Sequence, residues 1–270
     1  MLKIAIIGCG AIGGELVRSI KEGFLRDVKV VALLDINKEK ALMLAKELGE
    51  ENLVVDDLDE LLDRDPDVIV EAASPYALKE IARKILEADK TLIAMSSGAL
   101  LDQEFYKEVM SIINSGKGRL YIPSGAIGGV DILKAVSQIG GNVRLITIKS
   151  KEAFKKAKNL DKLGIDIEKI DKRTLVFKGK ASEAIKYFPT MINVSATISL
   201  AFGRDIDVEI YADPTIHYTV HEIEIETEAT VAKIILDNKH HPRNPKTSYL
   251  APLSLIRLIK GLTERIKIGT

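Results

Sequence analysis

Two of the four histidines in the sequence, His217 and His221, lie four residues apart in the segment ADPTIHYTVHEIEI. If residues 216–226 form a strand, the odd-numbered side chains share one face, which holds His217, Thr219, His221, Ile223 and Ile225. His221 then lies beside an apolar surface, with Glu222 and Glu224 on the opposite, solvent-facing side. Such a histidine is either a catalytic proton acceptor, since imidazole titrates near neutrality, or a core residue bonded to a backbone carbonyl.

A metal ion is a third interpretation of these histidines, and it requires another ligand such as Asp213 or His241. The sequence contains neither H-E-x-x-H spacing nor paired cysteines, and this disfavours a metal site. His240 and His241 are adjacent in the proline-rich segment KHHPRNP, which predicts that both are solvated.

A glycine-rich turn, GCGAIGG, follows the first apolar run and precedes a segment of helical periodicity. In G-x-G-x-x-G spacing, one glycine makes the turn, the second lets backbone approach a pyrophosphate, and the third lets helix and strand pack closely. The free N–H groups at the helix N-terminus favour phosphate. The sequence therefore predicts a dinucleotide site that includes Gly8, Gly10, Ala11, Ile12 and Gly13.

An acidic residue, Asp35, ends the second predicted strand at the distance expected of a carboxylate that binds ribose hydroxyls. Its charge should repel a 2′-phosphate, which favours NAD over NADP as the cofactor. Asn37 and Lys38 lie close enough to weaken that preference, so NADP stays an alternative. Cys9 serves as a small side chain in the turn, and no redox role is predicted for it.

Small residues follow two later predicted strands, at the edge of a doubly wound sheet where ligands gather. They are predicted to be further cofactor neighbours: Ala73, Ser74, Pro75, Ser96 and Ser97. The alternative is that these small side chains only permit close turns.

The elements that must position these residues form an α/β fold. Strands and helices alternate through residues 1–123, which predicts a doubly wound Rossmann domain with right-handed crossovers. Closely spaced strands and one helix predict a smaller α+β domain over residues 124–247, with an antiparallel or mixed sheet. Residues 248–270 predict a C-terminal helix, broken near Pro252, that packs back on the Rossmann domain. The lysine-rich segment 151–173 is expected to be a solvated loop or short helix without chemistry.

Composition limits the classes of function. A formal net charge of +0 gives no field that attracts nucleic acid or a membrane surface, and no apolar run approaches the length of a membrane span. A single cysteine and the absence of a signal-peptide pattern predict a cytoplasmic protein. Abundant Ile, Lys and Glu with only two glutamines indicate a thermophile, although AT-rich mesophiles share this bias.

Six segments together resemble the L-aspartate dehydrogenase family: GCGAIGGEL, EAASPYALKE, IPSGAIGGVD, INVSATISLAF, ADPTIHYTVHEI and HHPRNPKTSYL. Their order and spacing agree over nearly the whole chain, and PSGAIGG and NPKTS are the most distinctive. The resemblance implies NAD(P)-dependent oxidation of L-aspartate through iminoaspartate to oxaloacetate and ammonia. It also implies that the imine can supply NAD biosynthesis, and that the protein is a homodimer.

The resemblance also implies roles for single residues. His221 matches the catalytic histidine, Ala126 a position near the nicotinamide end of the cofactor, and Asn193 a second cofactor contact. Asn193 also has the alternative of capping a helix. His217 replaces an acid and Thr219 an asparagine expected from the family, so the substrate preference is open.

The segment RNPKTS precedes the last predicted helix and is the candidate clamp for a dicarboxylate. Cationic side chains and helix N–H groups would converge there, with Lys246, Thr247 and Ser248 as the substrate-binding residues beside Arg243. A helix cap made by Thr247 or Ser248 is the alternative.

Two other functions remain compatible with these motifs. One is a related two-domain dehydrogenase or reductase that acts on another small acid or semialdehyde. The other is a non-catalytic NAD-binding sensor, which would bind NAD without turnover and tolerate replacement of His221.

Overall fold

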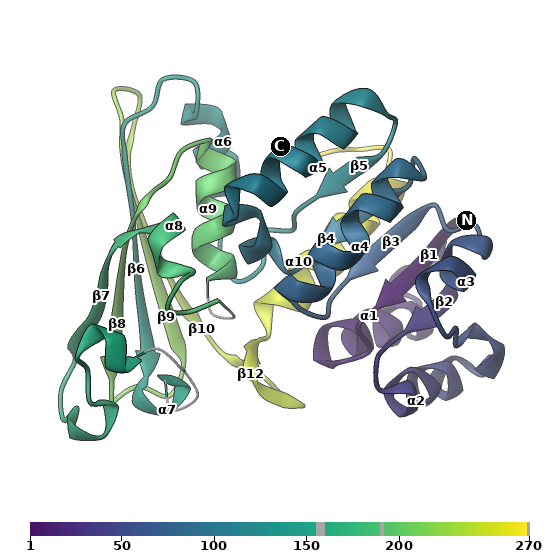
Figure 1. Cartoon of the computed structure of the whole chain (residues 1–270), viewed down its shortest axis with the longest axis horizontal. Helices are drawn as coiled ribbons and strands as arrows, with labels where there is room; N and C mark the ends of the chain where they lie inside the picture. The colour runs from purple at the N-terminus through teal and green to yellow at the C-terminus, as the bar shows by residue number, and fades with distance from the viewer. Residues whose placement is uncertain (155–159, 190–191, 269–270) are drawn as a thin grey trace. The chain divides into compact units, whose positions relative to one another are not determined.

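The chain folds into two compact units, traced by colour in Figure 1. The computed structural model describes residues 1–154, 160–189 and 192–268, the side chains of residues 161, 162, 245 and 246 excepted. Unit 1 comprises Met1–Gly125 and Ala251–Lys267, and unit 2 comprises Ala126–Leu250 with the end of the chain.

Unit 1 contains the predicted doubly wound parallel sheet. The strand order is β2-β1-β3-β4-β5, and every neighbouring pair is parallel. The strands are β1 (Leu2–Ile7), β2 (Val28–Leu34), β3 (Val68–Glu71), β4 (Thr91–Ala94) and β5 (Arg119–Tyr121). The chain passes from β1 to β2 on one side and to β3 on the other, so the switch point of the topology lies between β1 and β3. Ligands bind doubly wound sheets at the carboxyl ends of such strands.

Most helices of unit 1 begin at a residue whose side chain accepts a backbone N–H of the first turn. The helices are α1 (Ala11–Lys21), α2 (Lys38–Leu48), α3 (Leu58–Asp63), α4 (Pro75–Glu87) and α5 (Gln103–Ser115), with the 3₁₀ turns η1 (Glu51–Leu53) and η2 (Ser97–Leu101). The Asn37 side chain accepts the Glu39 N–H and starts α2, and Gly49, at φ 76°, ends it in the left-handed conformation.

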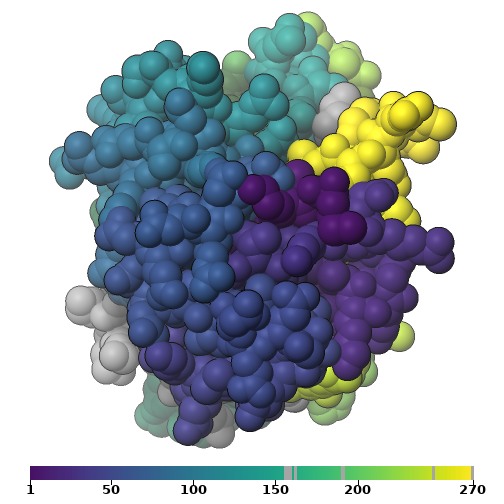
Figure 2. Space-filling view, turned by 90° about the vertical axis from the view of Figure 1, so that its right-hand side faces the viewer, coloured from purple at the N-terminus to yellow at the C-terminus, as the bar shows by residue number. Residues whose placement is uncertain are grey.

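The C-terminal helix α10 (Leu250–Thr263) is part of the unit 1 core, where Leu255, Ile256 and Ile259 are buried with residues of β1 and α1. Pro252 does not break this helix, because it lies in the first turn, where its missing N–H has no intrahelical partner. Near the other end of α10, the Lys260 ammonium lies 3.9 Å from the ring centroid of Phe24. Figure 2 shows the yellow C-terminal segment against the purple N-terminal residues.

Unit 2 contains a mixed five-stranded sheet in the order β10-β9-β6-β8-β7. Only the β6–β8 pair is parallel among the pairs of this sheet in the described residues. Its strands are β6 (Asn142–Ser150), β7 (Thr174–Lys180), β8 (Asp207–Asp213), β9 (Thr219–Glu226) and β10 (Val231–Asn238). The remaining elements are α6 (Val130–Val136), α7 (Lys151–Phe154), α8 (Ala181–Ala184), α9 (Asn193–Phe202), η3 (Leu160–Leu163), η4 (Ile167–Lys169) and the small hairpin β11 (His240–His241) and β12 (Asn244–Ser248).

The two faces of the unit 2 sheet differ in polarity because side chains alternate along each strand. We call the face that carries Leu145, Ile210 and Ile223 the inner face, and all three side chains are buried. Helices α6 and α9 lie beside each other on one side of this sheet (Figure 1).

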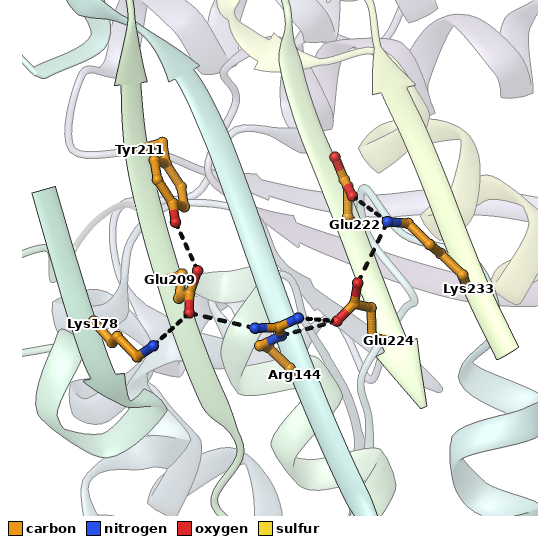
Figure 3. A network of polar contacts seen from close by, with 7 residues as sticks. All are labelled: Arg144, Lys178, Glu209, Tyr211, Glu222, Glu224 and Lys233. Carbon is orange, nitrogen blue, oxygen red and sulfur yellow. Dashed lines mark hydrogen bonds and ion pairs between the residues drawn. The ribbon is translucent and has the colours of Figure 1, made fainter. Parts of the chain in front are cut away.

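The opposite, outer face carries a polar network that crosses all five strands (Figure 3). Arg144 on β6 donates to Glu224 at 2.9 Å and lies 3.6 Å from Glu209, which also pairs with Lys178 at 3.0 Å and accepts from Tyr211 at 2.8 Å. On the far strand, Lys233 contacts Glu222 at 2.9 Å. Cations and carboxylates alternate across the strands, so the positive and negative charges of the network are equal in number.

Three expectations about these elements were wrong. The strand predicted over residues 216–226 begins at Thr219, so His217 lies outside it and is exposed. The lysine-rich segment is not wholly solvated, because Phe154 is 0% exposed and Leu160 and Ile167 are also buried; residues 155–159 lie outside the described part. The C-terminal helix is shorter than residues 248–270, since Ser248 belongs to β12 and the helix ends at Thr263.

Candidate active site

The glycine turn after β1 is tightly packed against the segment after β3. Gly8 has φ +98°, and a Cβ there would lie 2.6 Å from the carbonyl group of Ala72. A Cβ on Gly13 would lie 2.3 Å from the Gly8 carbonyl oxygen. Both positions therefore require glycine for steric reasons, as the predicted motif demands.

Gly10 has the opposite property, because a Cβ there would meet no atom within 4 Å. It is the N-cap of α1 without a side-chain cap, and the first turn, with Ala11 and Ile12, contains no acidic residue. The first internal helical bond runs from the Gly14 N–H to the Gly10 carbonyl, which leaves the preceding N–H groups for a ligand. Open space and N–H donors without an intrahelical acceptor at a helix N-terminus fit the pyrophosphate of a dinucleotide.

Asp35 is held against the same turn. One carboxylate oxygen accepts the Cys9 N–H at 2.7 Å, and the other accepts the Asn37 N–H at 2.8 Å. Each oxygen keeps a lone pair for a ribose hydroxyl. Lys38, which was expected to weaken the preference for NAD, forms an ion pair with Asp56 instead.

The Cys9 thiol is a structural side chain. Burial, with a smaller contribution from the Asp35 charge, raises its pKa to about 12. The thiol is therefore protonated at neutral pH.

A buried carboxylate, Glu71, joins the two loops that contain the other predicted cofactor neighbours. It ends β3, is 0% exposed, and accepts the Ala73 N–H at 2.8 Å, the Ser96 N–H at 3.0 Å and the Ser96 hydroxyl at 2.8 Å. Burial raises its pKa, and these hydrogen bonds oppose the rise. Sequence reasoning missed Glu71, although a glutamate that ends a strand as apolar as DVIVE was a usable signal.

The Glu71 contacts explain how the predicted small residues are arranged. Ala73 is exposed, and its N–H lies beside the position of a Gly8 Cβ, at 2.7 Å. Ser74 caps α4 by accepting the Ala77 N–H at 3.2 Å, and Pro75 is in the first turn of that helix. Ser96 and Ser97 are buried. The structure thus brings the glycine turn, Ala73 and Ser96 together, and the side chains of Ser74 and Ser96 have structural partners.

Replacing Glu71 with alanine should lower the free energy of unfolding by about 3 kcal/mol, since three donors lose their acceptor and the two on Ser96 are buried. Chemical denaturation measures this change. The matched control is Glu80→Ala on the exposed side of α4, which should change stability by less than about 0.5 kcal/mol. Equal stabilities of the two variants would show that Glu71 does not hold the loops.

His221 lies on the inner face of unit 2 and is 4% exposed. The register places it between Thr147 on β6 and Leu236 on β10, and its Nδ1 lies 3.0 Å from the Thr147 hydroxyl. Burial, and secondarily the charge of Lys149, lowers the pKa of His221 to about 3. The ring is therefore neutral at pH 7, and its pKa is lower than the near-neutral value expected from the sequence, because the imidazolium ion loses its hydration.

Three pieces of the resemblance converge near His221 through Asn238, a buried residue at the end of β10. The Asn238 amide donates to the Ala126 carbonyl at 3.0 Å, and its oxygen accepts the Ser248 hydroxyl at 3.0 Å. A Cβ on Gly129 would lie 2.1 Å from Ile234, so the segment after Ala126 also packs on β10. Sequence reasoning missed Asn238, and no local motif marks it.

The other predicted residues of unit 2 have mixed outcomes. Asn193 is the first residue of α9 and has partners of its own, but the N-cap is Ile192, so the alternative that Asn193 caps the helix is wrong and its cofactor contact stays a prediction. Ser248 bonds Asn238 rather than capping α10, and Thr247 lies beside it on β12. The Lys246 side chain lies outside the described part of the chain.

The remaining histidines do not join His221. His241 is 2% exposed, accepts the Arg243 N–H at 3.1 Å and packs edge-on against Tyr249, so the expectation that it is solvated was wrong. His240 is half-buried and donates to the His217 carbonyl at 2.6 Å. Within residues 1–154, 160–189 and 192–268, no group of three His, Cys, Asp or Glu side chains is arranged to hold a metal ion.

The comparisons with known proteins agree with both units. A family model described as the NAD-binding domain of homoserine dehydrogenase matches residues 8–123, and a model described as the C-terminal part of aspartate dehydrogenase matches residues 131–262. An L-aspartate dehydrogenase of Methanosarcina barkeri is 40% identical over 274 residues, covering 100% of each chain. The chain belongs to the aspartate dehydrogenase family.

Further relatives in this aspartate dehydrogenase family extend the comparison. An L-aspartate dehydrogenase of Methanocaldococcus jannaschii is 36% identical over 271 residues, with 100% of both chains covered. The crystal structure of aspartate dehydrogenase from Thermotoga maritima matches with a TM-score of 0.76 and 28% identity, also over 100% of both chains.

Membership in the aspartate dehydrogenase family makes this chain an oxidoreductase that uses NAD. The NAD-binding match falls within unit 1, where the open Gly10 position and Asp35 fit the cofactor. Among the helices of the described residues, none has the length and hydropathy needed to cross a membrane.

Proposed function

We propose that this protein oxidises L-aspartate, with NAD as the hydride acceptor, to iminoaspartate, which water converts to oxaloacetate and ammonia. The observation that carries the proposal is the identity of 40% to an L-aspartate dehydrogenase over the full chain. The convergence of Ala126, Ser248 and the His221 strand around Asn238 supports it, because these are the segments on which the family resemblance rests.

The first chemical task is to remove a proton from the substrate ammonium group, because hydride leaves the Cα only when the nitrogen lone pair can form the imine. Nicotinamide, when NAD is bound, accepts that hydride. His221 is a neutral base at pH 7, and its Nδ1 is occupied by the Thr147 hydroxyl at 3.0 Å. We assign the Nδ1 proton to the Thr147 bond, which leaves the Nε2 lone pair to accept the proton.

The second task is hydrolysis of the imine. After the proton from the first step has passed to solvent, the neutral His221 deprotonates the water that attacks the imine carbon, and it then gives that proton to the departing amine. A buried, neutral imidazole suits both steps, since it carries one proton and one lone pair at the same time. Ala126 and Asn193 serve as cofactor contacts in this proposal, and Lys246, Thr247 and Ser248 bind the substrate.

The proposal is tested by NADH formation at 340 nm with a panel of L-aspartate, L-glutamate, L-alanine and L-homoserine. A kcat/KM for L-aspartate at least about a hundredfold above the others is expected from a site built for a short dicarboxylate. Preference for homoserine would instead favour a related dehydrogenase. Homoserine is in the panel because residues 8–123 match a model of the NAD-binding domain of homoserine dehydrogenase. NADH binding without turnover on any substrate would favour the sensor.

Cofactor preference is a separate prediction. Asp35→Ser should raise the KM for NAD about tenfold and lower that for NADP, because the ribose bonds and the repulsion of a 2′-phosphate are lost together. The control is Asp27→Ser. Asp27 is an exposed carboxylate directly before the first residue of β2, so its replacement should leave the KM values for NAD and NADP unchanged. An unaltered NAD to NADP ratio in Asp35→Ser would remove Asp35 from cofactor selection.

The physiological setting completes the proposal. The imine is a precursor that NAD biosynthesis can consume, and the buried, unpaired Cys9 fits a reducing cytoplasm. We also assign a homodimer; the outer face of unit 2 supports this, since it is balanced in charge and exposes Val231 and Ile235 on its edge strand. Light scattering after size exclusion measures the assembly, and a mass near 29.6 kDa would contradict the dimer.

A further inference from the structure

Lys149 is a half-buried cation on the inner face of unit 2, on the same strand as Thr147. The parallel register sets it opposite Ala212 on β8, whose side chain is small and fully buried. In the antiparallel register, Thr147 lies opposite His221 and Ile148 opposite Val220, so the next position places Lys149 opposite Thr219, the first residue of β9. Lys149 is thus a diagonal neighbour of His221 on one face of the sheet.

The Lys149 side chain forms no hydrogen bond or ion pair with any residue that the structure describes, and no carboxylate acts on its titration. The strand lysines of the outer face differ, since Lys178 contacts Glu209 at 3.0 Å and Lys180 contacts Asp207 at 2.7 Å. Helix α9 (Asn193–Phe202) supplies no charged side chain at all. A half-buried ammonium loses part of its hydration, and no carboxylate of the described residues compensates that loss at Lys149, so an anionic ligand is the natural occupant of this place.

We propose that Lys149 binds a carboxylate of the substrate beside His221. This inference rests on the proposed function. It adds a substrate-binding residue that lies outside the sequence motifs shared with the family. Burial lowers the pKa of Lys149 only to about 8, so the ammonium form predominates at pH 7. An ammonium donor and a carboxylate form a charge-assisted hydrogen bond, which is stronger when it is shielded from water.

The pairing also affects the base. Burial and, to a smaller extent, the charge of Lys149 lower the pKa of His221, so the imidazole is neutral and weakly basic. A carboxylate on Lys149 offsets that charge and adds a negative one nearby, which raises the basicity of His221 when substrate is present. Lys149 thereby couples recognition of a dicarboxylate to proton transfer.

The experiment compares wild type, Lys149→Met, Lys149→Arg and Lys172→Met, an exposed lysine of the same unit that serves as the control. Binding of succinate, a dicarboxylate that cannot be oxidised at an amine, is measured by calorimetry and by the rise in Tm in the presence of NADH. Steady-state kinetics with L-aspartate provide the second readout.

In Lys149→Met the Kd for succinate and the KM for L-aspartate should each rise about thirtyfold to a hundredfold, with a smaller change in kcat. Its Tm without succinate should equal or exceed that of wild type, because a half-buried charge that has no counter-charge among the described residues is removed. Lys149→Arg should retain part of the affinity, and Lys172→Met all of it. Unchanged succinate binding and KM in Lys149→Met would overturn the inference.

The design separates this inference from the proposed function. Succinate binding that depends on Lys149, without oxidation of L-aspartate, would refute the proposed reaction and retain the carboxylate site. Oxidation of L-aspartate with equal KM in wild type and Lys149→Met would refute only the role of Lys149. If wild type neither binds succinate nor oxidises L-aspartate, both are refuted.

Discussion

Replacing His221 with alanine should lower kcat for L-aspartate by about two to four orders of magnitude, the usual contribution of a general base. The substitution removes the imidazole that Thr147 holds at 3.0 Å on the inner face of unit 2. NADH affinity should stay within about twofold of wild type, because the glycine turn and Asp35 belong to unit 1. Stopped-flow turnover and fluorescence titration with NADH measure the two quantities.

The matched control for this prediction is His217→Ala. His217 is the same residue type four positions earlier, but it precedes β9 and is exposed, so its replacement should leave kcat within about twofold. A His221→Ala variant that binds NADH and keeps wild-type kcat would remove His221 from the proton chemistry. Loss of activity in both variants to the same degree would point to the turn before β9 rather than to the base.

Replacing Gly13 with alanine should lower the free energy of unfolding by about 2–3 kcal/mol and abolish tight NAD binding. The added Cβ would lie 2.3 Å from the Gly8 carbonyl oxygen and 3.3 Å from Ile6 Cγ2, so α1 must move away from β1. The intrinsic helix propensity gained by alanine, at most about 1 kcal/mol, does not offset this clash. Chemical denaturation and NAD titration are the measurements.

Gly10→Ala is the companion variant, and it should behave in the opposite way. Its Cβ meets no atom of the protein within 4 Å and its φ is −82°, so stability should change by less than about 0.5 kcal/mol. NAD affinity should still fall about tenfold or more, since the methyl group occupies the space through which backbone meets the pyrophosphate. If Gly10→Ala bound NAD normally, the cofactor would not lie over this turn. If Gly13→Ala were as stable as wild type, the close packing of α1 on β1 would be incorrect.

Local patterns were sufficient for most of the fold. Apolar runs such as KIAII and DVIVE give buried parallel strands, and alternation in HEIEIE gives a strand with one buried face, as the structure confirms. The start of β9 was misplaced by three residues, because the alternating pattern continues through His217 while the backbone turns. Periodicity reports which face a side chain prefers and says little about where the hydrogen-bonded pairing ends.

The candidate site was predicted unevenly for a similar reason. The glycine motif is local, since three residues within one turn determine whether a helix can approach a strand, and it could be identified without a structure. Glu71 and Asn238 act on partners 25 and 112 residues away, Ser96 and Ala126 respectively. No spacing rule connects such pairs, because sheet order and loop packing bring them together.

The sequence by itself determined the α/β class, the dinucleotide turn with Asp35, and the placing of His221 on the apolar face of a strand, because each depends on residue types within a few positions. The tertiary structure alone decided that His221 is a neutral imidazole bonded to Thr147, that His241 is buried, and that the Lys149 side chain has no partner among the described residues. The physical reason is that burial and charge pairing depend on elements that local sequence patterns do not connect, as in the Thr147–His221 contact with its separation of 74 residues.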